Sequence, residues 1–180
     1  MSVPLERLAR EAGFTAGGYF VPRQLDVRSE VRDMCGAGRC GRFGACWTCP
    51  PYCGTLEECQ EAIYLRQQGF LVCTTARLED PFDYEGMKRA EEQHKRNFYA
   101  LTKRLSTQVQ NLLCLGAGAC TICAECTCPG RPCRHPEQAI PSMEGYGLVV
   151  GDVCQLAGIP YYGGPSTVSY FSCCLFDDQD

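Results

Sequence analysis

The stretch Phe-Leu-Val-Cys-Thr-Thr-Ala-Arg-Leu, residues 70–78, has the length and the apolar, β-branched composition of a β-strand. Soon after it, residues 84–108 repeat apolar side chains at intervals of three and four, which predicts a long amphipathic helix. One face of this helix carries Met87, Ala90, His94, Leu101 and Leu105. Another face places Glu91 four residues before Lys95 and Glu92 four residues before Arg96, a spacing that favours ion pairs.

Shorter segments on either side complete the pattern. Helical periodicity predicts helices at residues 4–12, 57–68 and 147–157, and apolar runs predict strands at residues 18–22, 111–115 and 167–176. We therefore expect an α+β fold: a single compact domain over residues 1–180, with a roughly four-stranded sheet and packed helices. Two Cys-rich loops, at about 33–59 and 116–136, interrupt this framework.

Composition narrows the class of protein. The 180 residues are 45% hydrophobic, which is enough for a real core, and the net charge of −4 comes without any basic stripe. We therefore expect no nucleic-acid partner, and the lack of a long apolar run predicts no membrane span. The first ten residues lack the apolar run of a signal peptide, so we expect a cytoplasmic protein whose 16 cysteines are reduced.

The second cysteine run resembles the loop of a bacterial ferredoxin. Its members are Cys120, Cys123, Cys126, Cys128 and Cys133. Three cysteines at two-residue separations, among glycines and alanines, favour a [4Fe-4S] cluster over zinc. Position 130, where a ferredoxin has its next cysteine, is Gly130, so we prefer Cys133 to Cys128 as the fourth ligand. His135 is an alternative ligand, although an ordinary loop histidine is the simpler interpretation.

The first cysteine run is looser. It consists of Cys35, Cys40, Cys46, Cys49, Cys53 and Cys59, and Pro50-Pro51 follows Cys49 directly. Cys46, Cys53 and Cys59 could each add a ligand to Cys35, Cys40 and Cys49, and nothing local decides among them. Trp47 either covers a cluster or anchors the loop on the core.

Other residues near the two runs suit a supporting role. Arg39 and Arg42 flank Cys40, and Arg131 and Arg134 flank Cys133, where guanidinium groups would raise the potential of an anionic cluster. Ser142 could cap the turn that follows it, whereas no pattern supports Glu144 as a general acid or base. The remaining cysteines lie in apolar segments and are expected to be small buried hydrophobes; they are Cys73, Cys114, Cys154, Cys173 and Cys174.

Two blocks of this sequence resemble an uncharacterised family of predicted metal-binding proteins. The first runs from Cys35 through Cys40-Gly-Arg-Phe-Gly to Trp47-Thr-Cys-Pro-Pro, and the second from Gly118 through Pro132-Cys-Arg-His-Pro to Pro141-Ser-Met-Glu-Gly-Tyr-Gly. The resemblance implies a thiolate metal site of the iron–sulfur type and no particular reaction. The family positions are Cys35, Cys40, Cys49, Cys120, Cys123, Cys126 and Cys133. Seven positions divide as four plus three, so one cluster would be closed and the other would have an open iron, unless a further cysteine completes it.

Three functional hypotheses follow. The first is an iron–sulfur protein, with two [4Fe-4S] clusters, that transfers electrons to a partner enzyme. The second is an enzyme that acts on a small-molecule substrate at an open iron, in sulfur transfer or in a reductive or dehydrating step. The third is a zinc-thiolate structural or interaction module. The sequence has no phosphate-binding loop, dinucleotide fingerprint or nucleophile elbow that would favour another class of enzyme.

Overall fold

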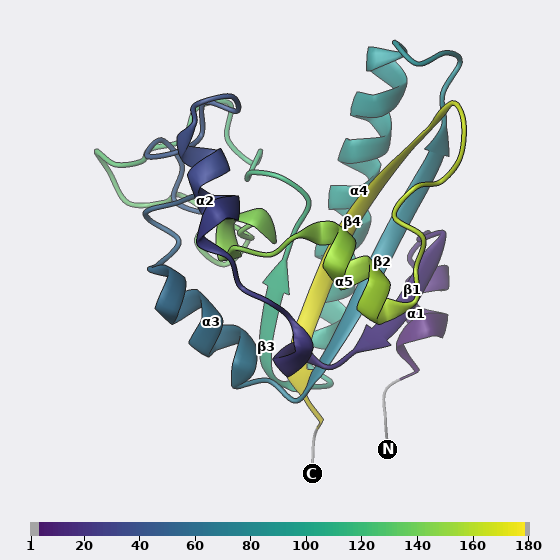
Figure 1. Ribbon diagram of the computed structural model, residues 1–180, viewed down its shortest axis with the longest axis horizontal. Coiled ribbons are helices and arrows are strands. Elements are labelled where there is room, and N and C mark those ends of the chain that lie inside the picture. Colours follow the sequence, from purple (N-terminus) through teal and green to yellow (C-terminus); the bar gives the residue numbers. More distant parts are fainter. Residues whose placement is uncertain (1–3, 179–180) are drawn as a thin grey trace.

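The computed structural model describes residues 4–178, and its centre is a four-stranded antiparallel sheet (Figure 1). The strands lie in the order β1-β2-β4-β3. Their bounds are Ala16–Phe20 for β1, Gln68–Arg77 for β2, Gln110–Leu115 for β3 and Thr167–Asp177 for β4. The long pairing of β2 with β4, in continuous register from Gln68–Phe176 to Arg77–Thr167, forms the middle of the sheet.

Helices cover both faces of this sheet. Their bounds are Leu5–Glu11 for α1, Ser29–Gly36 for α2, Leu56–Tyr64 for α3, Tyr84–Leu105 for α4 and Val150–Ala157 for α5, with 3-10 turns at Pro22–Gln24 (η1) and Glu144–Tyr146 (η2). In Figure 1, α4 lies behind the sheet and α5 in front of it, while α2 and α3 stand to one side. Within residues 4–178, none of the helices is long and apolar enough to cross a membrane.

Successive residues of β2 pack on opposite faces. Phe70 and Val72 join the apolar cluster that includes α1 and α4, whereas Leu71 and Cys73 join the cluster that includes α5. A strand buried on both sides reads as a continuous apolar run rather than as an alternating one, as residues 70–73 do. The structure confirms the predicted α+β fold, with a four-stranded sheet and packed helices.

The element missing from the sequence prediction is α2. We expected an irregular loop from residue 33, but Ser29–Gly36 is a helix and Cys35 lies in its last turn. Val31, Met34 and Cys35 lie at i, i+3 and i+4 on one face of α2, but the helix has only eight residues and none of them is buried, so the sequence pattern there is short. The predicted helix at 57–68 is also shorter, because α3 ends at Tyr64 and Gln68 already pairs in β2.

The cysteines predicted to be packing residues are in the core. Cys73, Cys154, Cys173 and Cys174 are buried, and Cys114 is half-buried with its Sγ atom 3.8 Å from that of Cys174. Burial raises the pKa of the Cys173 thiol, so this side chain stays neutral among its apolar neighbours. These five thiols therefore behave as small apolar side chains.

His94 is also part of the core. It projects from α4 onto the sheet, with Nδ1 2.7 Å from the Thr74 hydroxyl on β2 and Nε2 2.8 Å from the Ser172 hydroxyl on β4. A neutral imidazole satisfies both hydroxyls by donating at one nitrogen and accepting at the other. Burial lowers the pKa of His94 to about 4, so the ring is neutral at pH 7. One of the two histidines is thus used in packing.

We predict that His94 makes the free energy of unfolding depend on pH. Below its ordinary pKa of 6.5 the histidine of the unfolded chain takes up a proton, whereas that of the folded chain does so only below about 4. Its contribution to stability is therefore complete above pH 6.5. It falls as the pH drops towards 4, by roughly 1.4 kcal/mol for each unit of pKa difference.

Urea unfolding of the wild type and of His94→Gln, at about pH 7 and about pH 4.5, measures this effect. At the higher pH the variant should be less stable by about 1–3 kcal/mol, because a buried hydroxyl loses its partner. At the lower pH the difference in stability between the two proteins should be smaller. There the unfolded wild type gains stability by protonating His94, whereas the variant has no histidine at this position. Loss of a thiolate-bound metal in acid would lower the stability of the wild type and of the variant alike, so it cancels in the difference between them. A gap of equal size at both pH values would contradict the prediction.

Candidate metal centres

The two cysteine-rich loops lie against each other beside α2 (Figure 1). The Trp47 indole Nε1 donates a hydrogen bond to the Arg131 carbonyl at 3.1 Å. The backbone N–H of Cys120 donates to the Thr48 hydroxyl at 3.4 Å, and that hydroxyl lies 3.3 Å from the Cys46 sulfur. Periodicity alone could not say whether the loops meet; the tertiary structure brings them together and makes Trp47 an anchor between them.

One cavity, of about 600 Å³, is lined by Cys35, Cys40 and Cys49. Cys35 comes from the last turn of α2, Cys40 from the exposed turn after it, and Cys49 from the buried segment before Pro50. Backbone of the second loop closes one side at Gly118 and Ala119. We call this the three-cysteine cavity.

A second, much smaller cavity of about 20 Å³ lies between the loops. Five cysteines line it: Cys46, Cys120, Cys123, Cys126 and Cys133. The four predicted from the second run are therefore together, and Cys46 of the first run joins them. Cys128 of the same run is not among its lining residues. We call this the five-cysteine cavity.

The three open candidates for a further ligand at the first site therefore lie elsewhere. Cys46 faces the five-cysteine cavity, while Cys53 and Cys59 form a pair of their own at the start of α3. The Cys53 thiol donates to the Gly145 carbonyl at 3.4 Å, and an Arg32 guanidinium nitrogen lies 3.8 Å from its sulfur. A hydrogen bond from the Cys59 thiol, assisted by Arg32, lowers the pKa of Cys53 to about 7. None of the three lines the three-cysteine cavity.

The thiols of the two cavities differ in electrostatic setting. Burial raises the pKa of Cys49 to about 12, and the neighbouring Cys46 thiol adds to this effect. Burial alone would also raise the pKa of Cys126, but hydrogen bonds from the backbone N–H groups of Cys128, Trp47 and Thr127 and from the Cys46 thiol lower it on balance. Backbone donors aimed at sulfur stabilise negative charge, as a thiolate-bound centre requires.

The flanking arginines take different positions. Arg39 lines the three-cysteine cavity and Arg134 lines the five-cysteine cavity, where its guanidinium also donates to the Glu125 carbonyl at 3.0 Å. Arg131 is exposed and contributes the carbonyl that holds Trp47. Arg42 is half-buried within the first loop, where its carbonyl accepts from the Ala45 N–H. His135 also lines the five-cysteine cavity.

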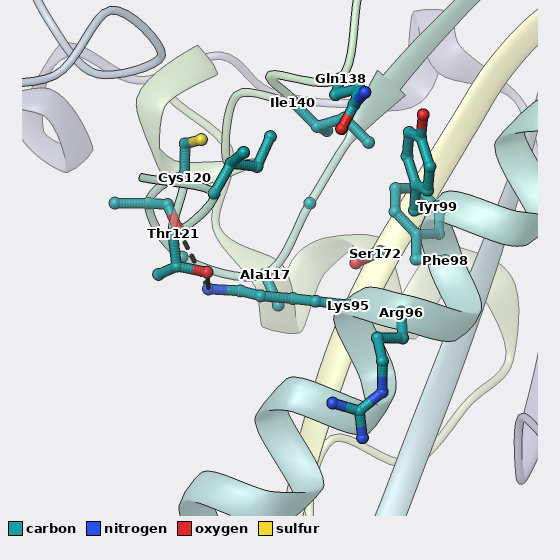
Figure 2. A pocket seen from close by; sticks show the side chains of 14 residues that line it. Lys95, Arg96, Phe98, Tyr99, Ala117, Cys120, Thr121, Gln138, Ile140 and Ser172 are labelled. Carbon is teal, nitrogen blue, oxygen red and sulfur yellow. Dashed lines mark hydrogen bonds between the residues drawn. The ribbon is translucent and has the colours of Figure 1, made fainter. Parts of the chain in front are cut away.

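Lys95 is a positioning residue that the sequence prediction missed. Figure 2 shows it reaching from α4 to the second loop, at the edge of a separate pocket of about 240 Å³. Its ammonium donates to the Ala119 carbonyl at 3.1 Å and to the Thr121 hydroxyl at 3.5 Å, on either side of Cys120. The predicted ion pair with Glu91 forms as well, at 2.7 Å. Only the i,i+4 pairing was detectable in the sequence, because the loop contact is long-range.

Glu144 and Ser142 belong to the three-cysteine cavity. The Ser142 hydroxyl accepts a hydrogen bond from the Gly145 N–H at 2.9 Å, which confirms the predicted cap of this turn. The Oε2 atom of Glu144 is buried and has no hydrogen-bond partner among the described residues. Burial raises the pKa of Glu144, although hydrogen bonds from its own N–H and from Ser142 oppose the shift. No sequence pattern singled out Glu144, because its partners come from distant segments.

The donor set of the two cavities fits a thiolate-bound metal. Soft thiolates with few other ligands are typical of iron–sulfur clusters and of zinc. In residues 4–178, no three side chains of His, Cys, Asp or Glu converge closely enough for a single ion. The thiols line the walls of the two cavities instead.

The chain matches the family model described as "Predicted metal-binding protein (DUF2284)" over residues 19–176. Searches of curated proteins and of solved structures gave no match. The matched span includes both cysteine-rich loops, the strands β2 and β3, and all but the last residue of β4. Because the match covers most of the chain, this protein belongs to that family of predicted metal-binding proteins.

Proposed function

We propose that this protein carries two iron–sulfur clusters, one for electron transfer and one that binds a small molecule at an open iron. The observation that carries the proposal is the division of the cysteines between two cavities. Five thiols surround one cavity, and only three line the other, which is larger and opens to solvent. A cubane needs four ligands, so the two cavities suit different tasks.

The ligand set around the five-cysteine cavity suits a [4Fe-4S] cluster that relays electrons. Cys120, Cys123, Cys126 and Cys133 supply four thiolates, and Cys46 lies next to them as a fifth sulfur. Backbone donors near Cys126 and the guanidinium of Arg134 stabilise the cluster charge. We propose that a redox partner protein in the cytoplasm exchanges electrons at this cluster, because this loop is partly exposed.

The three-cysteine cavity suits a cluster with three thiolates and one iron free of thiolate. Such an iron supplies Lewis-acid chemistry to a bound molecule. The cavity of about 600 Å³ is within the range of small-molecule sites, and Arg39 gives it a positive charge for an anionic group. We therefore favour a reductive or sulfur-transfer step on a small substrate over electron transfer alone.

The two cavities are close enough to work together. Cys46 lines one cavity and Cys49 the other, although only two residues separate them in the chain. In the second loop, Ala119 lines the larger cavity and the next residue, Cys120, lines the smaller one. Electrons that enter at the relay cluster would therefore have a short path to the open one.

Metal and sulfide analysis after anaerobic purification tests the iron assignment. We predict about eight iron and about eight acid-labile sulfide per chain, with broad absorbance near about 400 nm. Reconstitution with iron and sulfide should not raise these values further. A colourless protein loaded with zinc would overturn the proposal and leave a zinc-thiolate module as the function.

Single Cys→Ser variants test the division of ligands. Cys133→Ser should lose the relay cluster and about half of the iron, whereas the matched control Cys128→Ser, from the same loop, should keep both clusters. Cys53→Ser and Cys59→Ser should also keep both, because neither thiol lines a cavity. Electron paramagnetic resonance of the reduced proteins distinguishes the two clusters. Loss of the cluster at Cys35, Cys40 and Cys49 in Cys46→Ser, Cys53→Ser or Cys59→Ser would contradict the three-thiolate site.

A further inference from the structure

The three-cysteine cavity contains one more group that can bind a metal. Its lining includes Glu144, the first residue of η2, beside Cys35, Cys40 and Cys49. This carboxylate is the acidic side chain among the residues that line the cavity, and Arg39 is the basic one. The four side chains come from three separate segments: α2 with the turn after it, the first loop near Pro50, and η2.

One oxygen of the Glu144 carboxylate lacks the partner that a buried polar atom needs. This atom, Oε2, is shielded from solvent and makes no hydrogen bond within residues 4–178. Burying a polar oxygen without a partner costs free energy, more so for a charged one, so such an atom calls for an explanation. An ionised carboxylate only accepts, so the group that completes it is a hydrogen-bond donor or a cation such as a metal ion.

The position of Glu144 is fixed by its neighbours. Met143 before it is almost completely buried, and Gly145 after it is buried and held by the Ser142 hydroxyl. A side chain on Gly145 would meet the Ser142 hydroxyl oxygen at 3.2 Å and the Thr48 carbonyl at 3.5 Å, so η2 packs tightly on the first loop. The backbone at Glu144 is therefore held in place against the first loop.

Glu144 also lies within electrostatic reach of the thiols. Glu144 lines the same cavity as Cys35, Cys40 and Cys49. Three thiolates and a carboxylate in one half-buried place are unfavourable without a positive centre. A cubane binds each of its four ligands through a different iron, so ligands that surround a cavity suit it.

We propose that Glu144 is the fourth ligand of the cluster at Cys35, Cys40 and Cys49, bound through its carboxylate to the iron that has no thiolate. The inference rests on the proposed iron–sulfur function and gives the open iron a resident oxygen ligand. A carboxylate binds iron less firmly than a thiolate does, so it holds the fourth iron in the resting protein and gives way to an incoming small molecule. Glu144 is thus a metal ligand that an incoming substrate displaces from the iron.

Mild oxidation with ferricyanide tests this ligand assignment on the full-length, anaerobically purified protein. A cubane whose fourth iron is weakly held releases that iron and becomes a [3Fe-4S] cluster, which has its own paramagnetic signal. We expect Glu144→Gln to fall from about eight to about seven iron per chain while sulfide stays at about eight. The wild type and the control Glu85→Gln, an exposed acid in the first turn of α4, should keep about eight under the same treatment.

A second variant tests the same assignment by strengthening the bond to this iron. Glu144→Cys places a thiolate where the carboxylate stands, so its cluster should resist ferricyanide for at least about ten times longer than that of the wild type. The signal of the relay cluster, which does not involve Glu144, verifies that each variant is folded. The ligand assignment alone fails if the wild type holds eight iron but loses one as fast as Glu144→Gln does. Absence of iron and sulfide from the wild type would instead overturn the proposed function.

Discussion

The antiparallel pairing of β2 with β4 is the constraint on which the rest of this structure depends. Ten residue pairs hold the two strands in one register, and their side chains alternate between an α1/α4 face and an α5 face. A shift of one residue would exchange the two faces and separate each side chain from the cluster in which it packs. The same pairing places β3 beside β4, and the second cysteine loop leaves the sheet directly from the end of β3.

A small number of polar contacts then assembles the metal-binding region outside the sheet. Thr48 joins the Cys46 sulfur to the backbone of Cys120, Trp47 joins the first loop to Arg131, and Lys95 ties the second loop to α4. These contacts link segments that are 24 to 84 residues apart. They divide the cysteines into a set of five and a set of three, and this division is the basis of the functional proposal.

Two buried ionisable side chains illustrate how the structure separates packing from function. His94 is buried with both ring nitrogens paired to hydroxyls, so it needs nothing further from its surroundings. Glu144 has a buried oxygen without a partner and lies at the wall of a cavity lined by thiols. A satisfied buried group is part of the core, whereas an unsatisfied one at a cavity indicates a ligand that the protein chain does not itself supply.

The sequence by itself determined the α+β class, the strands and helices with an apolar stripe, and the two cysteine-rich loops with their thiolate character. These features are local: hydrophobic periodicity and cysteine spacing depend on neighbours within a few residues. It did not reveal α2, a helix of eight residues that buries none of them, nor the role of Lys95 or Glu144. Tertiary structure alone decided that Cys46 joins the second set, that Cys53 pairs with Cys59, and that Glu144 faces three cysteines. The physical reason is that these groupings arise from contacts between distant segments, which only the packing of both loops against the sheet brings together.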